Sequence, residues 1–372
     1  MKRKVGILGY GGKVGQIVVD ILKEKYLLKC GQRSISEDIY INSDDTIEYC
    51  KIDICNHEML KEFCLDCDLL INCTGPSYFT SCKIAEEIQK YDIKFVDIFG
   101  VTLLNNKKAL SNLTGVIGAG SFPGFSAILV SWIAERYGKS IENLSIYAGG
   151  KELITTNACV DVLMSMVENF GKTDRYIFYG SVSINERKPN ESKLFNIFGR
   201  KAYINEYLTD EIYNAGIKYG IKELHWYNVQ INPLYKTVMD RAVMDLAKIK
   251  SKDDIYQVAE KIKIDLEKSN YNSNNWYKYW IEITINNGFG KYLENIEVVC
   301  SDTYKINGII AAMCVERLLN NKYHKNIYWA FDLLDSEIVI KNLVSNGAIT
   351  DIKVGNESIM NKLFTEIEEG EI

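Results

Sequence analysis

Residues 4–15, which read KVGILGYGGKVG, decide the fold of the N-terminal part of the chain. Lys4–Leu8 is a short apolar run of the kind that forms a buried strand, and residues 14–26 repeat apolar side chains at helical spacing. The glycines between them allow a tight turn, so that a pyrophosphate can approach the amide groups at the start of the helix. A strand, a glycine turn and a helix in this order predict a dinucleotide site on Gly9, Tyr10, Gly11, Gly12, Lys13, Val14 and Gly15.

Short apolar strands and amphipathic helices alternate from the N-terminus to residue 122. Strands are predicted at 27–31, 46–54, 68–73, 94–99 and 115–119, and helices at 56–65, capped by Asn56, and 79–91. This alternation is typical of α/β folds, and nearly continuous apolar strands indicate a sheet with helices on both faces. We therefore expect residues 1–122 to form a Rossmann domain with a doubly wound parallel sheet.

The pattern changes after residue 122. Strands with many tyrosines and tryptophans are predicted at 143–148, 176–184, 223–231, 277–286 and 296–301, with helices at 126–137, 158–170, 235–247 and 253–266. Widely spaced strands mixed with helices favour a second, α+β domain with a mixed or antiparallel sheet over residues 123–302. Residues 303–372 are expected to be a C-terminal helical segment that returns toward the Rossmann domain, and the apolar helix at 303–320 could complete that domain.

Composition and charge exclude several classes of protein. The chain has 372 residues and a formal net charge of -5, without a basic face, so we expect no nucleic-acid partner. No apolar run approaches the roughly 18 residues of a membrane span, so we expect no membrane partner. The ten cysteines follow no disulfide or zinc spacing, and the lone CxxC of Cys64 and Cys67 has no matching histidines. We therefore expect reduced thiols, no metal site and a cytoplasmic location.

The end of the second predicted strand bears on which dinucleotide binds. Sites for NAD usually place an Asp or Glu there, about 20 residues beyond the turn, to bind the ribose hydroxyls. Here the strand ends KCGQRS without a carboxylate, whereas Arg33 and Ser34 could contact a 2′-phosphate. We therefore predict NADP(H) in preference to NAD(H), the alternative being that Arg33 is a solvated loop side chain. Asp53 and Ile54 are predicted at the adenine edge, although Asp53 is equally suited to capping the next helix.

The carboxyl ends of the other strands supply further candidates, because ligands of doubly wound sheets lie beyond those ends. Small residues and prolines there would let the nicotinamide half and the substrate approach the backbone, although they also mark ordinary loops. Cofactor contacts are predicted at Cys73, Thr74, Gly75, Pro76, Asp97 and Gly120, and substrate contacts at Tyr78, Phe122, Pro123 and Gly124.

Three side chains are candidates for catalysis. Asp97 is a carboxylate in an otherwise apolar strand, and a buried carboxylate needs hydrogen bonds or a shifted pKa. It could equally cap a nearby loop. Tyr78 is the phenol nearest to the expected hydride site, where it could donate a proton or simply line the cleft. His225 is the best-placed histidine for acid–base work, although a histidine within a strand is also suited to a structural role.

Several separated stretches form one larger pattern. They are GYGGKVG at 9–15, NCTGP at 72–76, VD at 96–97 and GSFPGFS at 120–126, with YAGG at 147–150 and SDTY at 301–304 as weaker matches. Together they resemble the saccharopine dehydrogenase superfamily and its shorter lysine-dehydrogenase-like members, firmly over residues 1–150 and loosely beyond. The resemblance implies an NAD(P)-binding Rossmann domain, a second domain for substrate and dimerisation, and therefore a homodimer. It also implies hydride transfer at a carbon–nitrogen centre in an interdomain cleft.

Three functions stay open at this point. The first is imine reduction, or amine or amino acid oxidation, on a small molecule. The second is reduction of an enoyl or imine group on a carrier-bound intermediate of secondary metabolism, since residues beyond 120 include few arginines and many aromatic rings. Core packing explains most of those rings. The third is a non-catalytic module that senses the dinucleotide, because a fold and a cofactor do not define a reaction.

Overall fold

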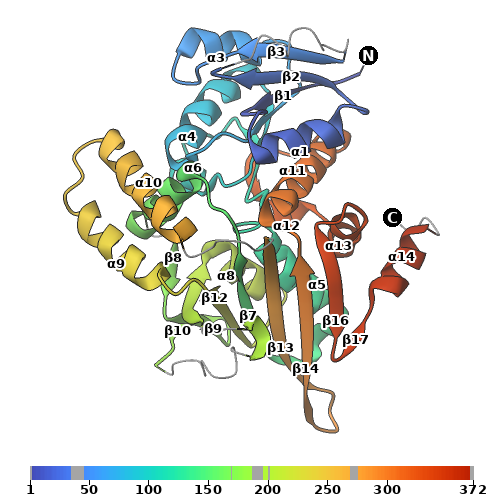
Figure 1. Ribbon diagram of the computed structural model, residues 1–372. Coiled ribbons are helices and arrows are strands. Elements are labelled where there is room, and N and C mark those ends of the chain that lie inside the picture. The colour runs from blue at the N-terminus through green and yellow to red at the C-terminus, as the bar shows by residue number, and fades with distance from the viewer. Residues whose placement is uncertain are drawn as a thin grey trace. The chain divides into compact units, whose positions relative to one another are not determined.

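The computed structural model describes residues 2–34, 46–168, 170–186, 196–199, 202–268 and 275–368. The chain divides into two compact units (Figure 1). One comprises Met1–Ile128 and Tyr304–Val339, and the other comprises Leu129–Thr303 and Ile340–Ile372. Each unit has a β-sheet of its own, and the two are described separately below.

The first unit contains the parallel sheet that the sequence predicts, so that expectation is confirmed. Over the described residues the sheet has seven strands in the order β15-β6-β5-β4-β1-β2-β3, and every neighbouring pair is parallel. Strands β1 and β4 are buried along nearly all their length, as expected when helices cover both faces. The strands are β1 (Lys4–Leu8), β2 (Leu27–Gln32), β3 (Ile47–Lys51), β4 (Leu69–Asn72), β5 (Lys94–Asp97), β6 (Thr114–Ile117) and β15 (Asn326–Trp329).

The helices of the first unit lie on opposite faces of its sheet. The chain passes from β1 to β2 in one direction and from β3 through β4 to β5 in the other. Right-handed crossovers therefore put α1 (Lys13–Leu22) on one face and α3 (His57–Cys64) and α4 (Ser77–Ile88) on the other. The side chain of Asn56 caps α3 by accepting a hydrogen bond from the amide of Met59, as predicted.

The residues after Thr303 are divided between the two units, with Tyr304–Val339 in the first and Ile340–Ile372 in the second. Helix α11 (Thr303–Asn320) packs on α1, where Gly308 faces Ile17 so closely that a Cβ would lie 2.7 Å from that side chain's Cβ. Strand β15 then extends the first sheet beside β6. The residues after 339 differ from the expected helical segment, because β16 (Ile349–Val354) pairs with a strand of the second unit. Strands this short carry too few residues for their periodicity to be recognised.

The second unit contains a mixed sheet, which also confirms the expectation. Over the described residues it has ten strands, in the order β10-β9-β12-β7-β13-β14-β16-β17, with β11 beside β12 and β8 beside β11. Among these pairs β12 and β7 run parallel and the others antiparallel. The strands not yet given are β7 (Ile141–Lys151), β8 (Gly171–Thr173), β9 (Arg175–Phe178), β10 (Ser181–Ile184), β11 (Tyr203–Thr209), β12 (Glu223–Gln230), β13 (Trp276–Asn286), β14 (Lys291–Cys300) and β17 (Glu357–Ser358).

One face of this mixed sheet supplies the core of the second unit. Along β13, Ile281, Ile283 and Ile285 are buried while the residues between them are half-exposed. This alternation places the isoleucines on the face that helices cover. The remaining α-helices in the described residues are α5 (Phe125–Tyr137), α6 (Thr156–Val167), α8 (Asp210–Lys218), α9 (Tyr235–Leu246), α10 (Lys252–Lys268), α12 (Ala330–Leu333), α13 (Ser336–Ser345) and α14 (Met360–Glu368).

One predicted strand of the second unit is wrong. Residues 176–184 form a hairpin of β9 and β10 rather than a single strand. The two residues of its turn, Tyr179 and Gly180, have φ values of 47° and 79°, so both adopt the left-handed conformation that a tight hairpin turn requires. A tyrosine in the first of these positions hides the turn, because Asn or Asp is the usual signal there.

Among the helices that the structure describes, none combines the length and apolar character needed to cross a membrane.

Candidate functional site

The glycine turn lies between β1 and α1, where the sequence predicts it. Gly9 has a φ of 80°, a conformation that favours glycine, and its amide donates a hydrogen bond to the carbonyl of Gly31 at 2.8 Å. The amide of Gly12 donates to the carbonyl of Gly9 at 3.1 Å, which closes the turn. A Cβ on Gly9 would also lie 2.9 Å from the carbonyl oxygen of Cys73. The turn is therefore held against both neighbouring strands, β2 and β4.

Gly15 packs against the backbone of the same turn. A Cβ at this position would lie 2.6 Å from the Cα of Tyr10 and 2.9 Å from the carbonyl carbon of Gly9. The ring of Tyr10 is buried and its centroid is 5.2 Å from that of Tyr49 on β3. We therefore expect the backbone of Tyr10, rather than its ring, to face a ligand.

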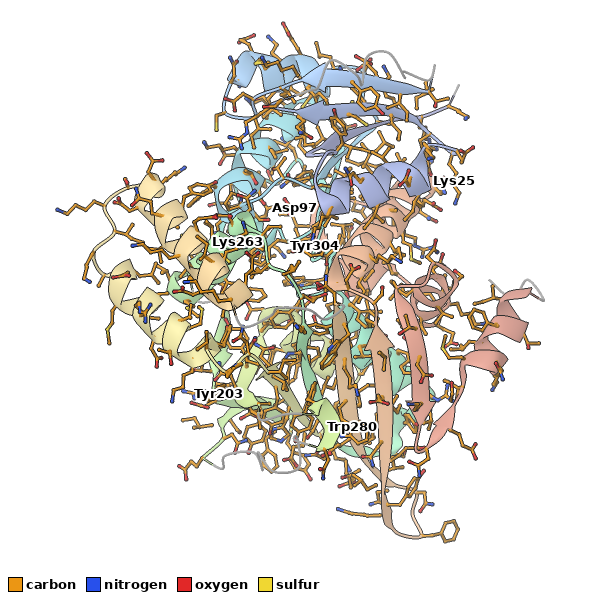
Figure 2. All side chains as sticks on the ribbon, in the orientation of Figure 1. Lys25, Asp97, Tyr203, Lys263, Trp280 and Tyr304 are labelled. Carbon is orange, nitrogen blue, oxygen red and sulfur yellow. The ribbon has the colours of Figure 1, made fainter. Side chains whose placement is uncertain are left out.

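The start of α1 favours an anion. Gly11, Gly12 and Lys13 are exposed, and the first turn of this fully described helix contains no acidic side chain. The partial positive charge of the helix N-terminus is thus not neutralised by a carboxylate of that turn. The ammonium of Lys13 lies 4.6 Å from the ring centroid of Tyr304, which Figure 2 labels at the start of α11. These features suit a bound phosphate group.

The end of β2 is joined to the glycine turn by a side chain that no sequence pattern marks. Gln32, the last residue of β2, accepts a hydrogen bond from the amide of Gly11 at its Oε1, at 2.8 Å. Its Nε2 donates to the carbonyl oxygen of Ser34 at 3.0 Å. Arg33 and Ser34, which follow Gln32 in the chain, are both exposed. The contact of Arg33 or Ser34 with a 2′-phosphate stays a prediction.

The end of β3 reaches the same edge of the sheet. The amide of Ile52 donates to the carbonyl of Gln32 at 2.9 Å. Asp53 is exposed, and its Oδ1 accepts a hydrogen bond from the amide of Cys55 at 2.9 Å, while Ile54 is half-buried. Asp53 thus shapes the turn before α3, which is close to the capping role considered above. A contact of Asp53 or Ile54 with adenine stays a prediction.

A buried polar network joins the ends of β4 and β5. The Nδ2 of Asn72 donates to Oδ2 of Asp97 at 2.8 Å. The Oδ1 of Asn72 accepts from both the amide and the hydroxyl of Thr74, at 3.0 and 2.6 Å. The amide of Phe99 donates to Oδ1 of Asp97 at 3.0 Å. The network therefore sets the course of the chain after both strands, including the turn that holds Thr74, Gly75 and Pro76.

Asp97 has no solvent exposure in this arrangement. Burial raises the pKa of its carboxyl group above the ordinary value, although hydrogen bonds from Asn72 and from the amides of Phe99 and Gly100 oppose the shift. Both carboxylate oxygens already accept hydrogen bonds within the protein. This geometry favours a positioning role for Asp97, whose catalytic role stays a prediction.

Tyr78 and Cys73 flank the turn after β4. Tyr78, in the first turn of α4, is half-buried, and its ring centroid is 5.1 Å from that of Phe99. Burial raises the pKa of the Cys73 thiol, which disfavours the thiolate and hence a nucleophilic role. Tyr78 thus lies beside Phe99, just beyond the ends of β4 and β5, and both of its predicted roles stay open.

The turn after β6 is fixed by a residue far away in the sequence. The amide of Phe125 donates to the carbonyl of Gly120 at 2.8 Å. The Oδ1 of Asn307, on α11, accepts from the amide of Ser121 at 2.6 Å. Phe122 is half-exposed, whereas Pro123 and Gly124 are buried. Local patterns hold no signal for Asn307, because its partner lies more than a hundred residues earlier in the chain.

His225 belongs to the second unit, where it lies on β12 between two carboxylates. Its Nδ1 is 2.6 Å from Glu206 Oε1 and its Nε2 is 2.9 Å from Glu223 Oε1. The Tyr176 ring stacks on it, with centroids 4.3 Å apart, and the Tyr227 ring lies parallel at 5.8 Å. Neutral imidazole has a single N–H, so donation to both carboxylates requires the imidazolium. Burial lowers the pKa of His225, but hydrogen bonds to Glu206 and Glu223 outweigh this and raise it overall.

This arrangement predicts that the contribution of His225 to the stability of the fold falls as the pH rises. The pKa of His225 is higher in the folded than in the unfolded chain. The contribution of His225 to the free energy of unfolding is therefore complete below about pH 6.5, the ordinary pKa of histidine, and is lost as the pH rises through the pKa of the folded state. Replacing His225 with Gln should lower the free energy of unfolding by about 2 kcal/mol at pH 6, because Glu206 is left buried without a cation. The difference between His225→Gln and the wild type should shrink toward pH 9.

Denaturant unfolding at several pH values measures this effect. His324 is exposed, so His324→Gln is the matched control and should follow the wild type. A constant difference between His225→Gln and the wild type across the pH range would contradict the proposed charge state. Turnover of His225→Gln at pH 6 tests the separate prediction that His225 acts in catalysis.

Comparisons with known proteins identify the fold. No protein-family model and no curated protein matches the sequence. The structure is similar to that of apo saccharopine dehydrogenase (L-Glu forming) from Saccharomyces cerevisiae, with a TM-score of 0.63 and 13% identity over 95% of this chain and 99% of the yeast protein. A more distant likeness, with a TM-score of 0.46 and 12% identity, links 92% of this chain to 98% of C. glutamicum DAP dehydrogenase in complex with DAP. The first comparison confirms that the chain has the saccharopine dehydrogenase fold.

Proposed function

We propose that the protein is an NADP(H)-dependent oxidoreductase that transfers a hydride at a carbon–nitrogen centre. The glycine turn carries the proposal. It follows an interior strand of a parallel sheet, leaves a helix N-terminus open to an anion, and includes Gly15, where a Cβ would meet the backbone of the turn. A glycine turn of this kind lets a pyrophosphate approach the backbone closely, because no Cβ atom stands in the way.

The residues around the turn have distinct roles in the proposal. The amides at the start of α1 and the ammonium of Lys13 bind the pyrophosphate, while Arg33 and Ser34 bind the 2′-phosphate. The network of Asn72 and Asp97 fixes the turns that border the nicotinamide half. The nicotinamide ring supplies or accepts the hydride when the cofactor is bound. The protein's own contribution is to orient the reactants and to exclude water.

Two observations support a carbon–nitrogen centre as the place of reaction. The stretches at 72–76 and 120–126 resemble those of the saccharopine dehydrogenase superfamily, and the fold is that of the yeast saccharopine dehydrogenase. A fold alone does not define a reaction, so the substrate needs a direct assay. We infer imine reduction or the reverse oxidation of an amine, on a free or a carrier-bound substrate.

Cofactor binding and turnover test this function in two stages. Quenching of protein fluorescence gives the Kd values of NADPH and NADH, and NADPH consumption is then followed with 2-oxo acids plus amines and with enoyl thioesters. Turnover of the first mixture supports the proposal. Turnover of the thioesters alone favours the enoyl reductase, and binding without any turnover favours the sensor. Absence of binding to either dinucleotide would overturn all three functions.

Arg33 provides a separate prediction about the cofactor. Arg33→Ala should raise the Kd of NADPH about tenfold, because one charge-assisted contact to the 2′-phosphate is lost, and should leave the Kd of NADH unchanged. Arg317→Ala, which removes an exposed arginine of α11 in the same unit, is the matched control and should change neither value. An equal weakening of both dinucleotides by Arg33→Ala would show that the guanidinium does not recognise the 2′-phosphate.

A further inference from the structure

The side chain of Gln32 links three parts of the dinucleotide site. Gln32 is the last residue of β2. Its side chain accepts a hydrogen bond from the amide of Gly11 in the glycine turn and donates one to the carbonyl of Ser34, in the turn that also holds Arg33. Both groups of its amide are therefore used, one on each side. The fit is close, because a Cβ on Gly11 would lie 2.8 Å from Cδ of Gln32. The side chain is thus a bridge between two turns, rather than a solvated strand end.

The amide group matters for this bridge. A carboxylate can accept from Gly11 but has no hydrogen to donate to the carbonyl of Ser34. A glutamate here would therefore keep the first contact, lose the second, and place two acceptors against each other at Ser34. It would also put a negative charge at the strand end where dinucleotide sites recognise the 2′ position of the ribose.

We propose that Gln32 is the positioning and specificity-determining residue for the 2′-phosphate. The proposal rests on the dinucleotide site inferred above. Gln32 holds the turn of Arg33 and Ser34 against the glycine turn, so that both sets of phosphate-binding groups keep a fixed spacing. Because its amide is neutral, it occupies the position of the acidic residue of NAD sites without repelling a phosphate. The selectivity of the site therefore comes from Gln32 together with Arg33.

Two nearly isosteric substitutions separate these roles. Gln32→Glu keeps the acceptor for Gly11 and adds a charge, so the Kd of NADPH should rise about 30-fold and that of NADH should stay within about threefold of the wild type. Gln32→Met removes both hydrogen bonds without adding charge, so it should weaken NADPH by about tenfold and NADH, which has no 2′-phosphate, by only about threefold. The matched control is Gln89→Glu, which makes the same charge change in the 3-10 helix Gln89–Tyr91.

The experiment uses the full chain, with Kd values from fluorescence quenching and with thermal unfolding as a check on folding. A change in the ratio of the NADPH and NADH Kd values for Gln32→Glu, without a change for Gln89→Glu, supports the proposal. An unchanged ratio, or Gln32→Met binding as tightly as the wild type, overturns it. Failure of the wild type to bind either dinucleotide would instead overturn the proposed function. If Gln32→Glu fails to fold, the ratio of the two Kd values for Gln32→Met decides the proposal, and an equal weakening of NADPH and NADH overturns it.

Discussion

Replacing Gly15 with alanine should abolish dinucleotide binding, with a Kd for NADPH at least about 100-fold above that of the wild type. The added Cβ would meet the backbone of Gly9 and Tyr10 rather than a flexible side chain. The turn could accommodate it only by moving away from α1, which would displace the amides that bind the pyrophosphate. Alanine favours a helix by about 1 kcal/mol over glycine, but overpacking of this kind costs about 1–3 kcal/mol. The net effect on stability should therefore be a loss.

A glycine in open surroundings provides the control for this substitution. A Cβ added to Gly290 would have no neighbouring atom within 4 Å, so Gly290→Ala should bind NADPH as the wild type does. Titration by fluorescence quenching gives both Kd values, and thermal unfolding shows whether Gly15→Ala is still folded. Tight NADPH binding by a folded Gly15→Ala would mean that the pyrophosphate does not lie on this turn.

The turn could be predicted because its sequence pattern is local. Strand β1, the glycines and α1 are adjacent in sequence, and Gly15 meets the backbone of Gly9 and Tyr10 only a few positions away. The cap of Asn56 on α3 was predictable for the same reason. Alternation of strands and helices then gave the parallel sheet, since each βαβ crossover is also a contiguous segment.

The features that could not be predicted depend on contacts between distant residues. Asn307 reaches the turn at Ser121, and β15 joins the sheet beside β6, although neither stretch carries a local mark of that destination. Gln32 was visible at the strand end, but the pattern there indicates only that a carboxylate is missing. Its two hydrogen bonds depend on the relative positions of β2 and the glycine turn, which only the folded chain defines.

Asp97 allows a test that separates positioning from catalysis. If it positions the turns, Asp97→Leu should lower the free energy of unfolding by about 3–5 kcal/mol, because Asn72 Nδ2 and the amide of Phe99 lose their acceptor while remaining buried. Asp97→Asn keeps the size and one acceptor, so the loss should be about 2 kcal/mol. The cofactor Kd should rise along with the loss of stability, because the turn of Thr74 to Pro76 depends on the same network.

A catalytic Asp97 would behave differently. Asp97→Asn would then lower kcat by about 100-fold or more, as expected when a general acid or base is lost, while the free energy of unfolding and the Kd of NADPH stayed near wild-type values. Asp20→Asn makes the same change at an exposed aspartate of α1, in the same unit, and should alter neither stability nor kcat strongly. Because both oxygens of Asp97 already accept hydrogen bonds inside the protein and neither is exposed, we expect the first outcome. Denaturant unfolding, NADPH titration and turnover of one set of variants decide between the two roles.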